Sequence, residues 1–287
     1  MVATNTRRKQ SAGCAERPLL TVSRHPTPPH RRTQVDVDTK VVEDAPTIDT
    51  SPCALLAIDV SKTYGDAPAL NPVSLRVETG DRVALIGHNG SGKTTFLKMS
   101  AGLLDPSSGE VSINGNKAGS LGARADVSYI SDQPTFYDDL SVWEHLEYVA
   151  RLHGVDEWEQ LAADLLAHLG LYDRADELPN RFSRGLKQKA AIAIGFIRPF
   201  DVLLVDEPFV GLDAAGKEAL LTLLQQASDE GATVIVATHE LSFVHTVKRI
   251  VALRDGQLVH DGPATGVNVD ALVRNEDPAG EHDGEGK

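Results

Sequence analysis

Residues 87–94 read Gly-His-Asn-Gly-Ser-Gly-Lys-Thr, and they stand between an apolar run, Val83–Ile86, and a segment that can continue as a helix, Phe96–Ser100. A glycine-rich loop that joins a buried strand to a helix is typical of phosphate-binding loops, because glycines permit backbone angles that aim successive N–H groups inward. The alternative, a chance glycine-rich turn, is disfavoured by the strand before it and the helix after it. The sequence therefore predicts a phosphate-binding loop for ATP or GTP.

The residues of this loop suit different tasks. Gly87, Gly90 and Gly92 let the backbone approach the phosphates, where other side chains would block them. Lys93 can reach the terminal phosphates, and the Thr94 hydroxyl can bind Mg²⁺. We expect the rest of the loop and the residue after it to contact the nucleotide as well: His88, Asn89, Ser91 and Thr95.

Length and charge limit the classes of function. A chain of 287 residues suffices for one generous domain or two small ones, without support from disulfides or metals. The whole chain has a net charge of −13, and residues 1–32 carry +6, so residues 33–287 carry −19. This acidic body argues against nucleic-acid binding. Cys14 and Cys53 indicate neither a disulfide framework nor a metal cluster, which fits a reducing compartment.

The two ends of the chain are polar. Residues 1–53 are rich in Arg, Thr, Ser and Pro and lack the apolar core of a secretory signal, so we expect a disordered basic tail or a start site assigned too early. An organelle transit peptide stays open as an alternative. Residues 266–287 are expected to form an acidic tail, which leaves 54–265 as the folded domain. No apolar run approaches the length of a membrane-spanning helix, so any membrane-spanning partner must be a separate polypeptide.

The segment before the loop predicts antiparallel strands. Short alternating runs, Leu55–Ile58 and Val73–Val77, are separated by turn residues around Gly65-Asp66 and Asn71-Pro72. A second hairpin-like stretch, Gly109–Gly115, alternates in the same way and ends in Asn-Gly. We expect it to lie beside the first strands.

The pattern then becomes helical over residues of about 136–185. Ser141 and Glu144 have the spacing of a capping box, and four large apolar residues recur at helical spacing, which predicts a packed core rather than a binding site: Trp158, Leu161, Leu165 and Leu169. After Ala190, apolar runs alternate with a helical pattern: Val202–Val205, Ala214–Ser228 and Val234–Ala237. The sequence therefore predicts an α/β fold, a parallel sheet flanked by helices, with an antiparallel β subdomain and a helical insert.

Two adjacent acids, Asp206 and Glu207, follow the apolar strand 202–205. Ligands of open α/β sheets bind at the carboxyl ends of the strands. Asp206 is suited to hold Mg²⁺, directly or through water, and Glu207 is suited to polarise the water that attacks the γ-phosphate. A solvated acidic turn is the alternative, which the phosphate loop disfavours.

With these motifs in order, the stretch from Leu55 to Gly262 resembles the nucleotide-binding subunit of ABC transporters. The resemblance implies the P-loop ATPase fold of that family and four further roles. Tyr64 would stack on adenine, Gln133 would touch Mg²⁺ and the attacking water, Asp213 would cross the subunit interface, and His239 would contact the γ-phosphate.

The stretch Phe182–Leu186 resembles the family signature, whose common form is Leu-Ser-Gly-Gly-Gln, and departs from it at three of five positions. Ser183 and Gly185 are retained, so a hydroxyl and a backbone N–H can still meet a γ-phosphate at the start of a helix. Leu186 in place of Gln removes one polar contact, and Arg184 adds bulk and charge. These changes place the turnover rate in question, rather than the function.

The resemblance implies that two subunits, identical or different, associate head to tail with ATP between the phosphate loop of one and the signature of the other. Closure of the pair would drive the membrane permease. Hydrolysis by Glu207, with Gln133 and His239, would then reopen the pair. Asp132–Gly154 is most similar to exporter subunits of drug and haem systems, so export is favoured over import. The chain would act in the cytoplasm, on the inner face of the membrane, where the permease sets the substrate. A soluble ATPase acting on ribosomes or DNA, or a nucleotide sensor, is the alternative.

Overall fold

The computed structural model describes residues 53–273, so nearly all of the predicted basic tail lies outside the described residues. The predicted acidic tail, 266–287, begins with a short helix, α8 (Val269–Val273), whose Val269 and Leu272 pack on the core; the residues after it lie outside the described part. No helix among the described residues is long and apolar enough to cross a bilayer.

An antiparallel sheet of four strands has the order β2-β1-β4-β5, which confirms the predicted pairing of the two strand-rich segments. Its strands are β1 (Leu55–Tyr64), β2 (Ala67–Val77), β4 (Ser108–Ile113) and β5 (Asn116–Lys117).

The turn predicted at Gly65-Asp66 is confirmed, because β1 ends and β2 begins on either side of it. The turn predicted at Asn71-Pro72 is wrong. Both residues lie inside β2, at a shift in its register against β1. A bulge tolerates a proline, which has no N–H to donate, and the Asn71 N–H donates instead to the Gly256 carbonyl at 2.8 Å.

The second sheet has six strands in the order β10-β9-β3-β8-β7-β6, and all pairs are parallel except β10 with β9. Its strands are β3 (Arg82–Ile86), β6 (Val127–Ile130), β7 (Val202–Asp206), β8 (Thr233–Ala237), β9 (Arg249–Arg254) and β10 (Gln257–Pro263). Successive residues of a strand face opposite sides: Leu203 and Val205 join one hydrophobic cluster, whereas Val202 and Leu204 join the other. Both faces of the sheet are therefore covered, as the continuous apolar runs predict.

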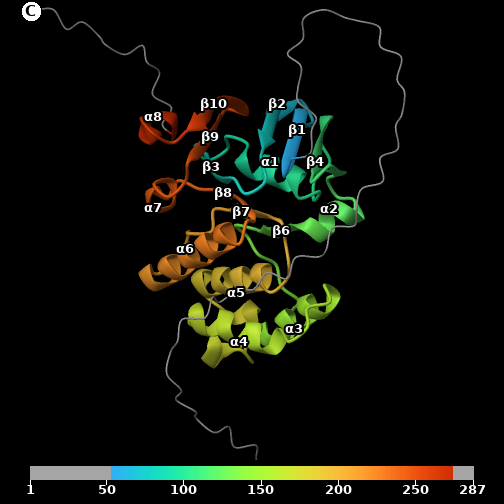
Figure 1. Cartoon of the computed structure of the whole chain (residues 1–287), viewed down its shortest axis with the longest axis vertical. Coiled ribbons are helices and arrows are strands. Elements are labelled where there is room, and N and C mark those ends of the chain that lie inside the picture. Colours follow the sequence, from blue (N-terminus) through green and yellow to red (C-terminus); the bar gives the residue numbers. More distant parts are fainter. Residues whose placement is uncertain (1–52, 274–287) are drawn as a thin grey trace, which may run out of the picture.

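The helices divide between the two faces of this sheet. The loop helix α1 (Lys93–Ser100) packs between the two sheets, and α2 (Leu121–Asp126) leads into β6. The opposite face carries α5 (Arg184–Phe196) and α6 (Ala214–Asp229), while α7 (Leu241–Val244) follows β8. Figure 1 shows the antiparallel sheet at one end of the molecule, beside β9 and β10 of the six-stranded sheet; the strands β8, β7 and β6 lie in the middle with α5 and α6, and α3 and α4 lie at the other end.

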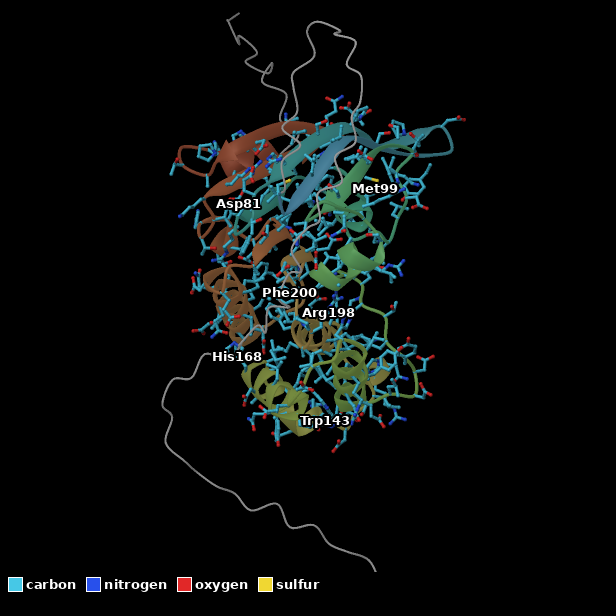
Figure 2. All side chains as sticks on the ribbon, turned by 45° about the vertical axis from the view of Figure 1, so that its right-hand side comes forward. Asp81, Met99, Trp143, His168, Arg198 and Phe200 are labelled. Carbon is cyan, nitrogen blue, oxygen red and sulfur yellow. The ribbon has the colours of Figure 1, made fainter. Side chains whose placement is uncertain are left out.

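The helical insert is present as predicted, with α3 (Val142–Leu152), α4 (Trp158–His168) and short 3₁₀ turns at Tyr172–Arg174 and Pro179–Arg181. Its capping box is confirmed: the Ser141 hydroxyl accepts from the Glu144 N–H at 3.2 Å, and the Glu144 carboxylate accepts from the Ser141 N–H at 2.7 Å. Trp158 packs on Trp143 with ring centroids 5.3 Å apart. Figure 2 shows Trp143 at the far end from Met99, the end that the insert occupies.

Candidate nucleotide-binding site

The phosphate loop connects β3 to α1, and its glycines are required by geometry. Gly87 has φ +153°, and a Cβ there would lie 2.2 Å from the Leu253 carbonyl oxygen. Gly92 is the N-cap of α1 in a left-handed conformation, and no side chain caps the helix. The first N–H groups of α1 therefore remain available to an anion, which the positive end of the helix dipole also favours.

Lys93 lies under this loop and is nearly buried. Its ammonium donates to the Gly87 carbonyl at 2.7 Å and to the His88 carbonyl at 3.2 Å, and lies 3.5 Å from a carboxylate oxygen of Glu207. The lysine therefore links the phosphate loop to the acid at the end of β7.

Asp206, the last residue of β7, is fully buried. Burial raises the pKa of its carboxyl to about 6, a hydrogen bond from Thr94 acts in the opposite direction, and the charges of Asp132 and Glu207 raise it further. The Tyr129 hydroxyl lies 3.5 Å from Oδ2. Burial raises the pKa of Tyr129 as well, so this phenol stays neutral.

Several buried oxygens around Asp206 have no hydrogen-bond partner in the described part of the chain, among them Asp206 Oδ1 and Ser91 Oγ. Unpartnered buried oxygens are costly, and a carboxylate beside a hydroxyl is a donor set that Mg²⁺ accepts. Asp206 and Thr94 therefore fit a Mg²⁺ ion, and the open N-terminus of α1 fits the phosphates that accompany it.

Glu207 turns the chain sharply out of the strand. It has φ +42°, in the left-handed region, and its N–H donates to the Ala237 carbonyl at 2.8 Å. Its carboxylate lies 3.1 Å from His239 Nδ1, and neither oxygen has a hydrogen-bond partner among residues 53–273. A strained backbone that holds an unsatisfied buried carboxylate is typical of functional sites.

The remaining predicted residues of the loop lie around this centre. His88 Nδ1 lies 2.8 Å from the Asn89 carbonyl oxygen, and its Nε2 lies 3.1 Å from a carboxylate oxygen of Asp255 in the β9–β10 turn. Asn89 and Gly90 are exposed, whereas Thr95 is half-buried in α1. Tyr64, at the end of β1, is 54% exposed, with the Lys62 ammonium 5.4 Å from its ring centroid.

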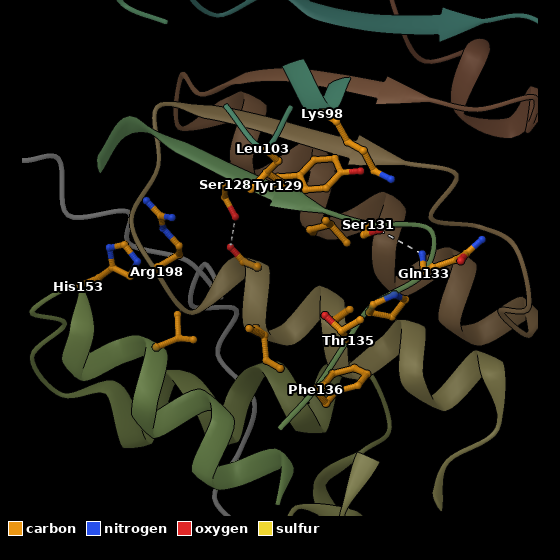
Figure 3. Close-up of a pocket in the computed structure, with 16 residues that line it drawn as sticks. Lys98, Leu103, Ser128, Tyr129, Ser131, Gln133, Thr135, Phe136, His153 and Arg198 are labelled. Atoms are coloured by element: carbon orange, nitrogen blue, oxygen red, sulfur yellow. Dashed lines mark hydrogen bonds between the residues drawn. The ribbon is translucent and has the colours of Figure 1, made fainter. Parts of the chain in front are cut away.

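Gln133 lies in the segment after β6. Its N–H donates to the Ser131 hydroxyl at 3.2 Å, and its side chain is exposed (Figure 3). Among the described residues, no hydrogen bond joins it to Asp206 or Glu207. The structure therefore brings Lys93, Thr94, Asp206, Glu207 and His239 together, and no hydrogen bond among the described residues connects Gln133 to them.

Three other predicted residues form a second group, at the N-termini of α5 and α6. Ser183 caps α5, Asp213 caps α6, and a Cβ at Gly185 would lie 2.3 Å from the Gly211 carbonyl oxygen. Lys189 joins the two helices, because its ammonium lies 2.9 Å from the Asp213 carboxylate and this hydrogen bond lowers the pKa of Asp213.

Sequence reasoning missed Lys189, Tyr129 and Asp255, which contact Asp213, Asp206 and His88. All three contacts join residues that lie on different elements, and a residue's spacing gives no signal for a partner on another element. Lys189 offered a weak signal, because it lies one helical turn after Gly185 on the same helix.

Comparison with known proteins agrees with this arrangement. The family described as ABC transporter matches residues 70–210. The ATP-binding protein SkfE of SkfA peptide export, from Bacillus subtilis, is 34% identical over 71% of this chain and 86% of its own length. The ABC-type transporter ATP-binding protein EcsA of the same species is 35% identical over 66% of this chain and 78% of its own length. The phosphonates import ATP-binding protein PhnC of Maricaulis maris is 34% identical over 77% of this chain and 92% of its own length.

Solved structures share the fold. One, described as the ATP-binding subunit of an ABC transporter, has a TM-score of 0.70 at 32% identity and covers 76% of this chain and 97% of its own. A dimeric post-hydrolysis state of the ATP-binding cassette MJ0796, bound to ADP and Pi, has a TM-score of 0.65 at 28% identity. The match covers 74% of this chain and all of that chain. Because the relatives match over most of both chains, this chain belongs to the ABC transporter family, as one of its ATP-binding and ATP-hydrolysing domains.

Proposed function

We propose that residues 54–265 form the ATPase domain that powers a membrane permease on a separate polypeptide, and that the site at the end of β7 carries the reaction. The observation that carries this proposal is the buried Glu207 carboxylate, which has no hydrogen-bond partner among the described residues and lies between Lys93 and His239. An acid held in this way beside a phosphate loop is placed to polarise a water molecule.

The residues of the site divide the work of hydrolysis. Lys93 and the N-terminus of α1 would bind the phosphates, and Thr94 and Asp206 would hold Mg²⁺. Bound Mg²⁺ neutralises the charge that develops on the phosphate oxygens. Glu207 would align the attacking water and draw off its proton, while His239 would fix the γ-phosphate from the other side.

The second group of residues supports a head-to-tail dimer. Ser183, Gly185 and Asp213 lie at two helix N-termini, and no hydrogen bond or ion pair among the described residues joins these three to the phosphate loop. The N-terminus of α5 is also suited to an anion. The dimeric assembly of the structurally similar cassette bound to ADP and Pi agrees with this arrangement.

A groove beside Gln133 is the surface that we assign to the permease. It has a volume of about 460 Å³ and lies between β6, α3 and α5 (Figure 3). Apolar side chains line it together with three basic ones, Lys98, His153 and Arg198, and none of its lining residues within 53–273 is acidic. In an acidic chain this charge favours a partner segment that is apolar and carries carboxylates.

Arg198 is fixed by hydrogen bonds and keeps its positive charge at neutral pH. Its guanidinium donates to the Arg124 and Ala125 carbonyls at 2.7 and 2.9 Å. Burial lowers its pKa to about 10, which the charge of Asp126 partly opposes, so it remains cationic at neutral pH. Docking of the permease in this groove would place the chain on the inner face of the cell membrane.

Export is the direction we favour. The relative SkfE carries peptide export in its name. The segment Asp132–Gly154 also resembles exporter subunits. The relative PhnC is named for import, so transport in the other direction is the outcome that would overturn this part of the proposal.

The test is ATP hydrolysis in membrane vesicles that contain a candidate permease, encoded beside this chain. We expect the permease to change the rate, Lys98→Glu to abolish that change, and Lys117→Glu to leave it intact, because Lys117 is exposed on β5, outside the groove. A rate that is indifferent to every membrane partner would favour a soluble ATPase.

A further inference from the structure

His145 of α3 is buried in the helical insert, with 5% of its surface exposed, and both of its ring nitrogens have partners. Nδ1 lies 2.8 Å from the Ser141 carbonyl oxygen, and Nε2 lies 2.9 Å from the Tyr137 backbone nitrogen. A carbonyl oxygen can only accept and an amide N–H can only donate. The partners therefore assign the proton to Nδ1, and a neutral ring accepts the Tyr137 N–H at Nε2.

Ring contacts hold the same segment. The Phe136 ring meets the His145 ring edge-on, with centroids 5.6 Å apart, and the Tyr137 ring stacks on it at 5.9 Å. Tyr137 in turn packs edge-on against Tyr148, one turn further along α3, at 5.7 Å. Residues 136 and 137 are thus fixed to α3 through both backbone and side chains.

The other end of this segment is fixed to a different part of the molecule. Ser131 directly follows β6, and its carbonyl accepts from the Gln188 side chain of α5 at 3.5 Å. The Ser131 hydroxyl accepts from the Gln133 N–H at 3.2 Å. Gln133 therefore lies between an anchor on the sheet and α5 and an anchor on the insert, and Figure 3 shows it beside Ser131 at the margin of the groove.

We propose that His145 is a positioning residue for hydrolysis, which acts through Gln133. The bond from the Tyr137 N–H to Nε2 makes the end of the 133–137 segment follow α3, so a displacement of the insert moves Gln133 relative to Glu207. The proposal rests on a proposed function of Gln133, the orientation of the attacking water, which the family resemblance implies and which no hydrogen bond to Asp206 or Glu207 among the described residues yet provides. His145 itself touches neither the nucleotide site nor Gln133.

Two substitutions separate the two hydrogen bonds of the ring. In His145→Asn the side-chain amide reaches the position of Nδ1, so the bond to the Ser141 carbonyl is kept and the acceptor for Tyr137 is lost. In His145→Gln the amide oxygen reaches the position of Nε2, so the acceptor for Tyr137 is kept. Both variants remove the imidazole, and only His145→Asn is expected to release the segment.

The experiment measures kcat and KM of the full chain for Mg-ATP, together with the thermal midpoint of each variant. We expect His145→Asn to lower kcat about three- to tenfold, the change in population that loss of one ordinary hydrogen bond produces. KM should stay near the wild-type value, because the phosphate loop is untouched, and His145→Gln should restore most of kcat.

The same substitutions in a Gln133→Ala background separate this inference from the proposed function. If Gln133→Ala alone leaves kcat unchanged, the proposed role of Gln133 fails, and the inference fails with it. If Gln133→Ala lowers kcat and His145→Asn then has no further effect, the positioning role holds. An equal loss of kcat with His145→Asn and His145→Gln, or a full further loss with His145→Asn in the Gln133→Ala background, would overturn the inference alone.

Discussion

Replacing Asp206 with Asn should stabilise the nucleotide-free protein at neutral pH, although Asp206 is a proposed Mg²⁺ ligand. Burial raises the pKa of this carboxyl from 3.8 to about 6. At pH 7 the folded protein therefore keeps a charged carboxylate in an environment that favours the neutral form. An amide at the same position has no charge to bury.

The sign and size of the effect follow from this shift. Below pH 3.8 the carboxyl is protonated in both the folded and the unfolded chain, so it contributes no pH dependence. As the pH rises towards 6, the unfolded chain releases its proton first, and the free energy of unfolding decreases. With a pKa raised by about two units, ionisation of Asp206 lowers the free energy of unfolding by about 3 kcal/mol at pH 7.5. The decrease is already about 1 kcal/mol at pH 4.5.

The assay is urea unfolding at pH 4.5 and pH 7.5, without nucleotide or Mg²⁺. A neutral amide oxygen accepts the Thr94 hydrogen bond less strongly than a carboxylate, which offsets part of the gain. We therefore expect the free energy of unfolding of Asp206→Asn to exceed that of the wild type by about 1–3 kcal/mol at pH 7.5 and by less at pH 4.5. Asp213→Asn is the control with the opposite sign, because the hydrogen bond from Lys189 lowers the pKa of Asp213 and stabilises its charged form. Two results would show that the charge of Asp206 does not destabilise the fold: an Asp206→Asn protein less stable than the wild type at pH 7.5, or a difference in the free energy of unfolding that does not change with pH.

Three further predictions concern the nucleotide. Lys93→Ala should weaken ATP binding at least tenfold, measured by calorimetry, since it removes the buried ammonium beside the loop; unchanged affinity would contradict the phosphate-loop assignment. Tyr64→Ala should weaken ATP binding about three- to tenfold while Tyr64→Phe keeps it, because a stacking ring needs no hydroxyl; equal losses in both would exclude stacking. Leu186→Gln should raise kcat by restoring a polar contact at the signature, and a lower kcat would count against that contact.

The core of the fold could be predicted because its strands are buried on both faces. Runs such as 202–205 and 234–237 are apolar throughout, and this pattern requires a sheet covered on each side. The helical insert was predictable because one capping box and one apolar stripe agree on it. Asn71-Pro72 misled the prediction, because turn residues also occur at bulges, and only the contact with Gly256 distinguishes the two.

The motifs of the site were predictable in type, and their contacts were not. Local sequence places Asp206 and Glu207 at the end of a strand, and the parallel order β3-β8-β7 brings that end towards the phosphate loop. Lys189 with Asp213 and His145 with Tyr137 depend on how α5 and α3 pack, which no local pattern encodes. The exposure of Gln133 was likewise beyond what spacing could predict.

We propose that Glu207 drives hydrolysis at a site shared by two subunits. The most direct measurement is sedimentation of Glu207→Gln with Mg-ATP, beside an assay of released phosphate and the bound nucleotide. We expect Glu207→Gln to form a dimer that retains unhydrolysed ATP, while the wild type releases phosphate and returns to the monomer. Normal phosphate release by Glu207→Gln, or a monomer that binds ATP and does not associate, would contradict it.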